Sequence, residues 1–436
     1  MIIAGKTPCR RGKSFAFRFA QITLSGNFPG IEMSHVSARV LALCITFSTP
    51  AFAHSVEMPC SANPAAAATV ARPDEALPKP ENFLFWTPTE QAIGYRNVEK
   101  IFPTHTIAKG TNTTQMPLAG CAFEVFYDFK GKPFDTAAFM EENRISGLLV
   151  LKNGKTVLER YGLGRTAADR WTSFSVAKSI TSTLVGAAIK DGLIKGLDAP
   201  VTDYIRELKG SAYEGVTIRQ LLTMSSGVKW NEDYEDPKSD VNVFARYEPE
   251  NKADNPIAAY MAKLPREAEP GTKFVYKTGE SDLIGVLLSR VLKVSLSDYL
   301  SEKIWKPMGA EQDGVWMTDQ SGTELGGCCI SMTLRDYGRF GMWFAAGGGD
   351  VLPKDWTKEA TAPLYDSHWA GTHYGFQWWI YPDSSYAAVG IFGQMVRIYP
   401  KENLVIVTNS AWPHADEDAN YEVTEAYIAA LRKTLN

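Results

Sequence analysis

The sequence predicts a mixed α/β (α+β) protein in which strands from both ends of the chain form one antiparallel sheet, with a helical region inserted between them. Two strand-like runs, 145–151 and 155–161, flank an Asn-Gly turn, which is a strong hairpin signal. Strand-like runs return near the C-terminus at 387–392 and 404–407. Between these two regions the apolar residues mostly recur with the period of a helix. The N-terminal and C-terminal strands must therefore pair with one another although a helical region separates them in the sequence.

Residues 33–53 have the layout of a secretory signal peptide. Met33 opens the segment, Arg39 precedes an apolar run, and Ala51-Phe52-Ala53 supplies the small residues of a cleavage site. Residues 1–32 are then an upstream extension. We expect the protein to be exported, and to be periplasmic or secreted; the alternative is a disordered tail with a chance apolar patch.

The composition excludes several classes of partner. The 436 residues are 45% hydrophobic and 22% charged, and no run approaches the ~18 apolar residues of a membrane span. Residues 1–53 carry six basic residues and one acid, so their removal would take the net charge from −4 to −9. Such an acidic chain is a poor candidate for binding nucleic acid or an anionic membrane. No cysteine and histidine spacing typical of a metal site occurs, and no cofactor is expected.

The expected domain organisation is a linker and wrapping segment over 54–135, followed by a main domain over 136–436. Prolines and a run of alanines are typical of a linker at the start of that segment. The predicted helices run from Ser175 to a stop signal at 191–192, over 218–224, over 282–293, after a Thr333–Asp336 capping box, and over 422–435.

Four cysteines would remain after cleavage at residue 53. Cys60 and Cys121 could pair in an oxidising compartment, although sequence alone does not fix connectivity. Cys328 and Cys329 are adjacent. They could form a vicinal disulfide, a pocket wall, or two small buried hydrophobic residues, and we favour the last of these.

Ser175 and Lys178 form the most informative pair in the chain. Three apart in the first turn of a predicted helix, they share one face, and the helix N-terminus favours negative charge at the serine oxygen. A lysine that is neutral part of the time could take the serine proton. The alternative is that Ser175 caps the helix and Lys178 is a solvated surface residue. Ser226 and Lys229 repeat the spacing in a glycine turn, which we interpret as chance.

Other routes to a nucleophilic serine find no support in the sequence. A Gly-x-Ser-x-Gly elbow does not occur, which disfavours an α/β-hydrolase. A Ser-His-Asp triad would have to use one of four histidines, none of which lies in a recognisable setting. These are His105, His368, His373 and His414.

Five segments together resemble the serine β-lactamase and penicillin-binding-protein superfamily. The closer resemblance is to class C β-lactamase-related hydrolases, a group that includes esterases and nylon-oligomer (aminohexanoate-dimer) hydrolases. It covers the chain from about residue 145 to the C-terminus. The matching segments are Ser175-Val-Ala-Lys178, Leu221-Leu-Thr-Met-Ser-Ser-Gly227, Pro270-Gly-Thr-x-Phe-x-Tyr276 with Leu283-Ile-Gly285, Gly326-Gly327 with Thr333-Leu-Arg-Asp336, and Gly390-Ile-Phe-Gly-Gln394.

The resemblance implies a β-lactamase/transpeptidase-like fold and an acyl-transfer mechanism. Ser175 would be the nucleophile, Lys178 its proton acceptor, and Tyr276 the group that relays the proton to the leaving group. The backbone N–H groups of Ser175 and Ile391 would form the oxyanion hole; each such donor is typically worth ~10²–10³ in rate. The candidate substrate-binding residues are Trp230, Tyr234, Cys329 and Phe392, although aromatic residues after a turn more often serve packing.

Two departures from the family pattern weaken recognition of a β-lactam. Thr278 stands where the family has the asparagine of a Tyr-x-Asn motif. The Lys-Thr-Gly of the family's third motif is spelled at 277–279, but it leads into a predicted helix. We therefore place the third motif on the strand at 390–393, which has no lysine for a substrate carboxylate.

The sequence therefore predicts an exported serine hydrolase that cleaves a small-molecule ester or amide through an acyl-enzyme on Ser175. One alternative is a β-lactamase or D-Ala-type peptidase. Another is a catalytically silent cell-wall binding protein on the same fold. The joint presence of Ser175, Lys178 and Tyr276 argues against the silent protein, which has no need of all three.

Overall fold

The computed structural model describes residues 75–120, 124–251 and 254–435. The predicted upstream extension, the signal peptide, the start of the linker and the Cys60–Cys121 pair lie outside these residues. Within them, no helix combines the length and the apolar character that crossing a membrane requires.

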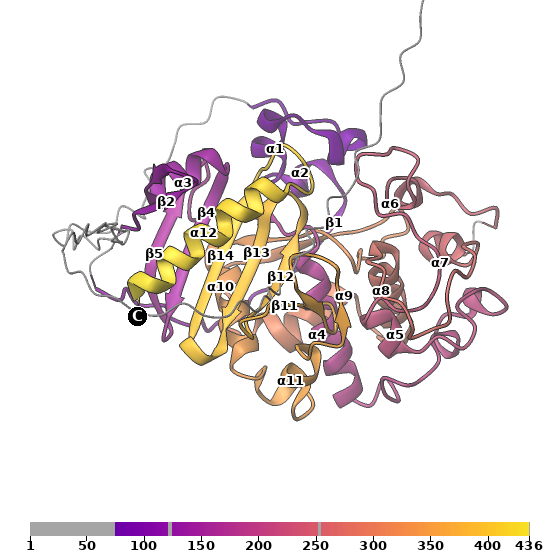
Figure 1. Cartoon of the computed structure of the whole chain (residues 1–436). Helices are drawn as coiled ribbons and strands as arrows, with labels where there is room; N and C mark the ends of the chain where they lie inside the picture. The colour runs from indigo at the N-terminus through magenta and orange to yellow at the C-terminus, as the bar shows by residue number, and fades with distance from the viewer. Residues whose placement is uncertain (1–74, 121–123, 252–253, 436) are drawn as a thin grey trace, which may run out of the picture. The chain divides into compact units, whose positions relative to one another are not determined.

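An antiparallel sheet of eight strands runs in the order β5-β4-β14-β13-β12-β11-β10-β9 (Figure 1). Its first two strands in sequence form the predicted hairpin, and the other six come from the C-terminal part of the chain. The predicted sheet built from both chain ends is therefore confirmed. The strands are β4 Ile145–Lys152, β5 Lys155–Tyr161, β9 Tyr365–Asp366, β10 His373–Tyr374, β11 Trp379–Ile380, β12 Tyr386–Gly390, β13 Gln394–Tyr399 and β14 Leu404–Ser410.

The C-terminal strands differ from the prediction at one point. Strand β12 ends at Gly390, and Ile391–Gly393 form a short 3-10 turn, so the predicted strand over 387–392 is wrong at its end. Phe392 and Gly393 have φ values of 59° and 83°, which reverse the chain into β13. The apolar residues of this turn continue the pattern of the strand. For this reason the sequence analysis predicted neither the turn nor the separate strand β13.

Alternate residues of β4 face opposite layers. Leu148 and Val150 pack in the core cluster that includes Tyr427 and Leu431 of α12 (Asp418–Leu435). Leu149 belongs to the other cluster, together with residues of α10 (Leu334–Ala345). The period of two along a strand thus places α12 across one face of the sheet and α10 against the other (Figure 1).

The backbone of helix α10 packs closely against the sheet because the helix has glycine residues at the contact. A Cβ on Gly338 would lie 2.6 Å from the side chain of Leu149, and a Cβ on Gly341 would lie 2.7 Å from that of Val405. The close contact fixes the position of α10 on the sheet, and with it the position of the segment 326–333, which leads into this helix.

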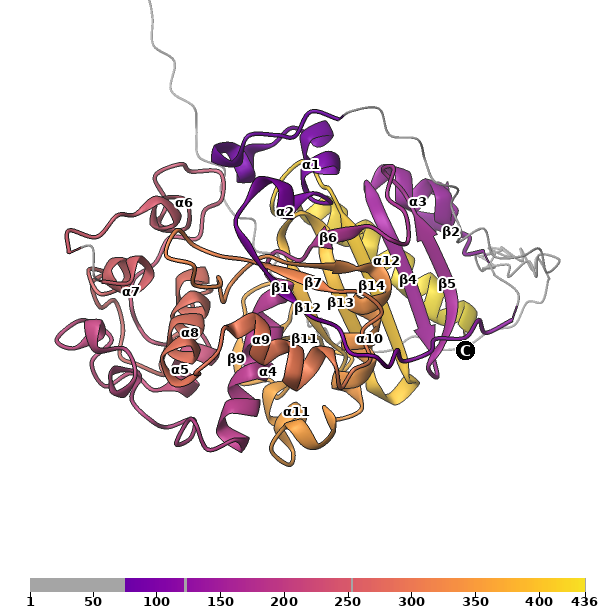
Figure 2. The same cartoon turned by 180° about the vertical axis from the view of Figure 1, so that it is seen from behind.

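A second, smaller sheet has the strand order β1-β7-β8-β6 and was not predicted (Figure 2). Its strand β6 ends three residues before Ser175 and pairs with β8, which follows the two cysteines. The N-terminal segment joins this sheet through β1. The strands are β1 Thr104–Ile107, β6 Arg170–Thr172, β7 Gly314–Met317 and β8 Ile330–Thr333; a separate hairpin pairs β2 Tyr127–Phe129 with β3 Lys132–Phe134.

Most of the helices lie in the predicted insertion, but the strands β7, β8, β9, β10 and β11 also fall inside the stretch that was predicted to be mostly helical. Helix α8 begins at residue 278, four residues before the prediction, and α12 begins four residues before the predicted 422. The remaining helices are α1 Pro88–Gly94, α2 Val98–Ile101, α3 Thr136–Glu142, α4 Val176–Lys190, α5 Ile218–Leu222, α6 Asp240–Val243, α7 Pro256–Met261, α8 Thr278–Val291, α9 Leu296–Leu300 and α11 Trp356–Ala360.

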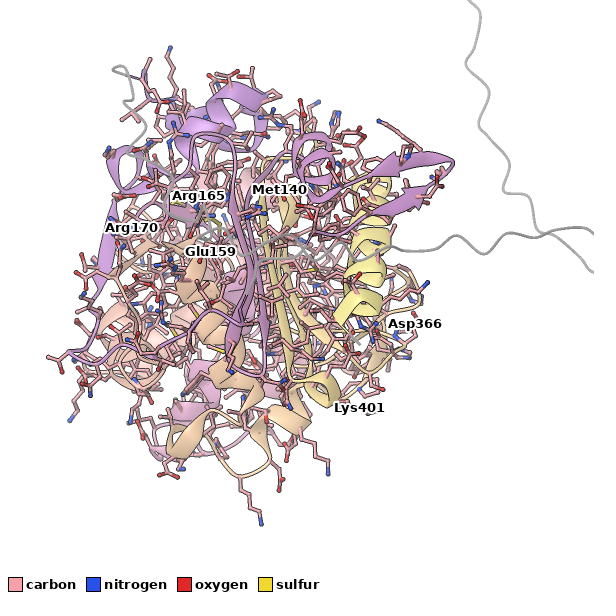
Figure 3. All side chains as sticks on the ribbon, turned by 90° about the vertical axis from the view of Figure 1, so that its left-hand side faces the viewer. Met140, Glu159, Arg165, Arg170, Asp366 and Lys401 are labelled. Atoms are coloured by element: carbon pink, nitrogen blue, oxygen red, sulfur yellow. A yellow bond between two sulfur atoms is a disulfide. The ribbon has the colours of Figure 1, made fainter. Side chains whose placement is uncertain are left out.

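Arg165 connects the two sheets just upstream of the serine. Its buried guanidinium donates to Oδ1 of Asn409 on β14 at 2.8 Å, and lies 5.4 Å from the ring of Trp171 on β6. Glu159 of β5, which Figure 3 also labels, accepts a hydrogen bond from Arg335 of α10 at 2.8 Å. The contacts of Arg165 hold the strand that leads into Ser175 against the large sheet.

Candidate active site

Ser175 is the residue before α4, but it does not cap the helix. Its side chain makes no hydrogen bond to the first turn, so the interpretation of this serine as a cap is wrong. Phe174, just before it, has a φ of 42°. The ring of Phe174 packs 5.0 Å from Tyr95 and 5.2 Å from Phe392. Packing therefore stabilises a strained turn that presents the serine hydroxyl, as strained backbone often does at functional sites.

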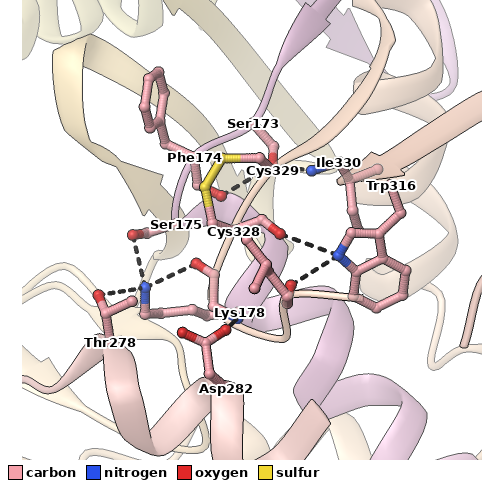
Figure 4. Close-up of a disulfide and its surroundings, with 12 residues drawn as sticks. Ser173, Phe174, Ser175, Lys178, Thr278, Asp282, Trp316, Cys328, Cys329 and Ile330 are labelled. Atoms are coloured by element: carbon pink, nitrogen blue, oxygen red, sulfur yellow. Dashed lines mark hydrogen bonds between the residues drawn. A yellow bond between two sulfur atoms is a disulfide. The ribbon is translucent and has the colours of Figure 1, made fainter. Parts of the chain in front are cut away.

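Lys178 is buried at 1% exposure, so it is not the solvated surface lysine of the alternative. Its Nζ lies 2.8 Å from Ser175 Oγ, 3.0 Å from Thr278 Oγ1 and 2.9 Å from the Gly327 carbonyl oxygen (Figure 4). Burial disfavours the charged form and lowers the pKa of Lys178 to about 8, against the opposing charges of Glu232 and Asp282. About a tenth of the lysine is then neutral at pH 7.

The partners of Lys178 decide where the lone pair of the neutral amine points. The Gly327 carbonyl can only accept a hydrogen bond. The Thr278 hydroxyl donates to the Glu232 carboxylate, so toward Lys178 it accepts. The two N–H groups of a neutral amine are used by these acceptors, and the lone pair faces the hydroxyl of Ser175. This arrangement is that of a general base.

Glu232 is a site residue that the sequence analysis missed. Its carboxylate accepts from the Thr278 N–H at 2.9 Å, from the Tyr234 hydroxyl at 2.7 Å, from the Thr278 hydroxyl and from the Trp230 indole. The signal was present, because this acidic residue lies between two aromatic residues that had already been singled out. Its full set of donors holds the carboxylate in place.

Asp282 orients Gly327, whose carbonyl oxygen accepts from Lys178. Its Oδ1 accepts from the Gly327 N–H at 2.8 Å, on the other side of the glycine whose carbonyl accepts from Lys178. Burial raises the pKa of Asp282 to about 7. The next two residues, Cys328 and Cys329, are joined as a vicinal disulfide, which was one of the three possibilities but not the favoured one (Figure 4).

Tyr276 lines the same pocket as Ser175. Its ring stacks on Trp379 at 5.6 Å, and Lys178 Nζ lies 5.3 Å from the ring centre. Burial raises the pKa of Tyr276 well above its ordinary value, and a hydrogen bond with Ser175 only partly opposes this. The phenol therefore stays protonated and can donate a proton to a leaving group.

The end of β12 lies directly against the serine turn. A Cβ on Gly390 would lie 2.6 Å from the Ser173 carbonyl oxygen and 2.9 Å from the Ser175 nitrogen, so only glycine allows this approach. Ile391 follows and lines the same pocket as Ser175. The contact brings together the two backbone segments that the sequence analysis expects to form an oxyanion hole.

The pocket in front of Ser175 has a volume of about 320 Å³. Its wall combines aromatic rings with three carboxylates, and no lysine or arginine is among the lining residues. Asp416 is open to the pocket, yet its enclosure by protein, together with the charges of Glu232 and Asp418, raises its pKa to about 6. The lining residues are Ser175, Glu232, Tyr234, Tyr276, Trp369, Trp379, Val389, Gly390, Ile391, Asp416, Asp418 and Tyr421.

The candidate substrate-binding residues separate into two groups. Tyr234 lines the pocket. Trp230, Cys329 and Phe392 are buried outside its lining, with exposures of 7%, 0% and 1%. Ser226, the serine of the repeated Ser-x-x-Lys spacing, is also buried, and its hydroxyl donates to Glu280. Within the described ranges, no cluster of three or more potential ligands could hold a metal ion.

Comparisons with known proteins place this geometry in a family. A family model described as Beta-lactamase matches residues 136–430. A 6-aminohexanoate-dimer hydrolase of Paenarthrobacter ureafaciens is 31% identical over 297 residues, covering 64% of this chain and 75% of that protein. A Bacillus anthracis structure, named as a candidate 6-aminohexanoate-dimer hydrolase, has a TM-score of 0.67 at 21% identity over 78% of this chain and 93% of its own.

A third comparison supports the same fold. A D-stereospecific amidohydrolase from Streptomyces sp. has a TM-score of 0.51 at 18% identity, covering 67% of this chain and 98% of that chain. At these identities the two solved structures show the shared fold alone. The predicted resemblance and the predicted fold class are both confirmed.

Proposed function

The chain belongs to the beta-lactamase family and is a serine hydrolase, and we propose that Ser175 is its nucleophile, Lys178 its general base and Tyr276 the proton donor to the leaving group. The observation that carries this assignment is the environment of Lys178. Two acceptors use its N–H groups, and the lone pair of the neutral amine is left for the Ser175 hydroxyl, 2.8 Å away.

The reaction begins when neutral Lys178 takes the proton of Ser175 as its oxygen attacks the substrate carbonyl carbon. Negative charge develops on the carbonyl oxygen, which the N–H groups of Ser175 and Ile391 stabilise. Tyr276 then gives its proton to the departing oxygen or nitrogen and recovers one from the lysine ammonium. Water attacks the acyl-enzyme by the reverse path, which returns Ser175 to its starting form.

The proposed substrate class is a small linear ester or amide. The wall of the pocket offers aromatic rings for an apolar chain, and its lining includes no cation for the carboxylate that a β-lactam carries. Thr278 replaces the amide that the family pattern places beside the lysine, and its hydroxyl is used by Glu232 and Lys178. These features favour a linear acyl compound over a β-lactam or a D-Ala-type peptide.

A panel of purified-enzyme assays tests this assignment. We expect hydrolysis of short p-nitrophenyl esters and of linear anilides, with loss of both activities in Ser175→Ala. Turnover of nitrocefin at rates comparable with the esters would instead favour a β-lactamase. Absence of any hydrolysis, with the folded protein binding cell-wall fragments, would favour the silent binding protein.

Export is proposed separately, on the pattern at 33–53 alone. N-terminal sequencing of the protein isolated from its producing cells is expected to start at His54. An intact N-terminus on the isolated protein would contradict export by this signal.

A further inference from the structure

The vicinal disulfide Cys328–Cys329 lies between two backbone segments of the active site (Figure 4). On one side, Gly327 precedes it and offers the carbonyl oxygen that accepts from Lys178 Nζ at 2.9 Å. On the other side, the N–H of Ile330 donates to Ser173 Oγ at 3.0 Å, two residues before the nucleophile. The disulfide therefore connects the acceptor that orients the base to the strand that supports the serine turn.

The backbone at Cys329 is held in a conformation that residues other than glycine rarely adopt. Its φ is 99°, which lies in the region that favours glycine. Its carbonyl oxygen accepts from the Met317 N–H at 3.1 Å, and its side chain is buried in the same apolar cluster as Phe174. Such strain persists only where the surroundings impose it, and the bond to Cys328 is one of these constraints.

The disulfide contributes little to global stability. A cross-link stabilises a protein mainly by restricting the unfolded chain, and the effect grows with the length of the loop that it closes. Here the bonded cysteines are adjacent in the sequence, so the closed loop contains no intervening residue. Neither cysteine is among the lining residues of the pocket. The bond therefore acts on the local geometry around Gly327, and not on the unfolded chain or on contacts with the substrate.

The two cysteines differ in their accessibility to a reductant. Cys328 is partly exposed, whereas Cys329 is 0% exposed. A thiolate of a dithiol reductant can attack Sγ of Cys328, which breaks the S–S bond and releases Sγ of Cys329. The second thiol of the reductant then attacks the mixed disulfide and releases Sγ of Cys328. Two electrons and two protons pass from the reductant to the cysteines, and the reductant becomes a disulfide itself.

We propose that Cys328–Cys329 is a redox modification site, at which a dithiol reductant slows hydrolysis by shifting the Gly327 carbonyl that orients Lys178. Once the bond is broken, the backbone of Cys329 is free to return to a negative φ, which moves the adjoining peptides. Asp282 still accepts from the Gly327 N–H, so the shift is local and the oxidised form is the more active one. This inference rests on the proposed function, because it acts through the base of that reaction.

Reversible reduction of the wild-type protein tests the proposal. The protein is reduced with dithiothreitol, freed of the reductant, and assayed with a p-nitrophenyl ester. We expect kcat to fall ~10-fold, because a small displacement of a catalytic group slows the chemical step, while KM changes less than ~2-fold. Oxidation with diamide should restore kcat. Iodoacetamide labelling after unfolding, followed by peptide mass spectrometry, should find Cys328 and Cys329 modified only in the reduced protein. Unchanged kcat in protein reduced at both cysteines, or resistance of the bond to dithiothreitol, would overturn the inference.

Cys328→Ala with Cys329→Ala is the matched variant. It cannot form the bond, so its kcat should be close to that of reduced wild type and should not respond to dithiothreitol. The Tm of reduced wild type should stay within ~3 °C of that of the oxidised protein, which separates a local shift from unfolding. A larger fall in Tm, or a response to dithiothreitol that persists in the variant, would overturn the inference and leave Ser175 as the nucleophile. Hydrolysis that survives Ser175→Ala would overturn the proposed function instead.

Discussion

The Nζ of Lys178 lies 2.8 Å from the Oγ of Ser175 in a part of the protein where the lysine is 1% exposed. Burial makes the lysine a usable base, because it lowers the pKa to about 8. The helix provides the spacing, and the neighbours Thr278 and Gly327 provide the orientation. Each of these contributions can be tested separately.

The pH dependence of hydrolysis should report the pKa of Lys178. The neutral amine is the active form, and it is lost as pH falls below about 8. With a neutral ester, kcat/KM should therefore fall about tenfold for each pH unit below that value and level off above it. A profile that stays flat from about pH 6 to 9 would contradict Lys178 as the base.

Substitution of Asp282 should move this profile. The negative charge of Asp282 raises the pKa of Lys178, so Asp282→Asn removes an opposing effect and the pKa should fall. The rising limb of kcat/KM should then shift to lower pH, while the amide oxygen can still accept from the Gly327 N–H. Asp203→Asn changes an acid paired only loosely with Lys195, at 3.9 Å, and should leave the limb in place. A shift in both variants would mean that general charge, and not this contact, sets the pKa.

Thr278 should matter through its hydroxyl. Thr278→Val removes both the acceptor for Lys178 and the donor to Glu232, and should lower kcat by ~10–100-fold because the base loses its orientation. Thr278→Ser keeps the hydroxyl and should retain most of kcat. Equal losses in the two variants, measured with one ester at its pH plateau, would show that packing and not the hydrogen bond is responsible.

Gly390 should be intolerant of a side chain. Gly390→Ala places a Cβ 2.6 Å from the Ser173 carbonyl oxygen, which should push the end of β12 away from the serine and lower kcat by ~10²-fold or more. Gly110→Ala is the matched control, because its Cβ would lie 3.4 Å from the nearest atom. Full activity in folded Gly390→Ala would contradict an oxyanion hole built from this strand end.

The local parts of the site could be predicted from the sequence. Ser175 and Lys178 are three residues apart on one helix, so their proximity follows from helix geometry alone. The hairpin of β4 and β5 follows from an Asn-Gly turn between two apolar runs. The terminal helix and the capping of α10 by Thr333 also follow from short-range patterns.

The parts assembled from distant segments could not be predicted in this way. Glu232 reaches Thr278 across 46 residues, and Gly327 reaches Lys178 across 149. Neither contact leaves a periodic signal in the chain. The turn after β12 was missed because Ile391 and Phe392 continue the apolar pattern of the strand, while the reversal depends on backbone angles that the tertiary contacts impose.

The most direct test of the central claim is labelling by a fluorophosphonate probe, which reacts with an activated serine. Wild type should be labelled, Ser175→Ala should not be, and folded Ser226→Ala should be labelled as wild type because Ser226 is buried and donates to Glu280. Labelling that persists in Ser175→Ala, or that is lost only in Ser226→Ala, would contradict Ser175 as the nucleophile.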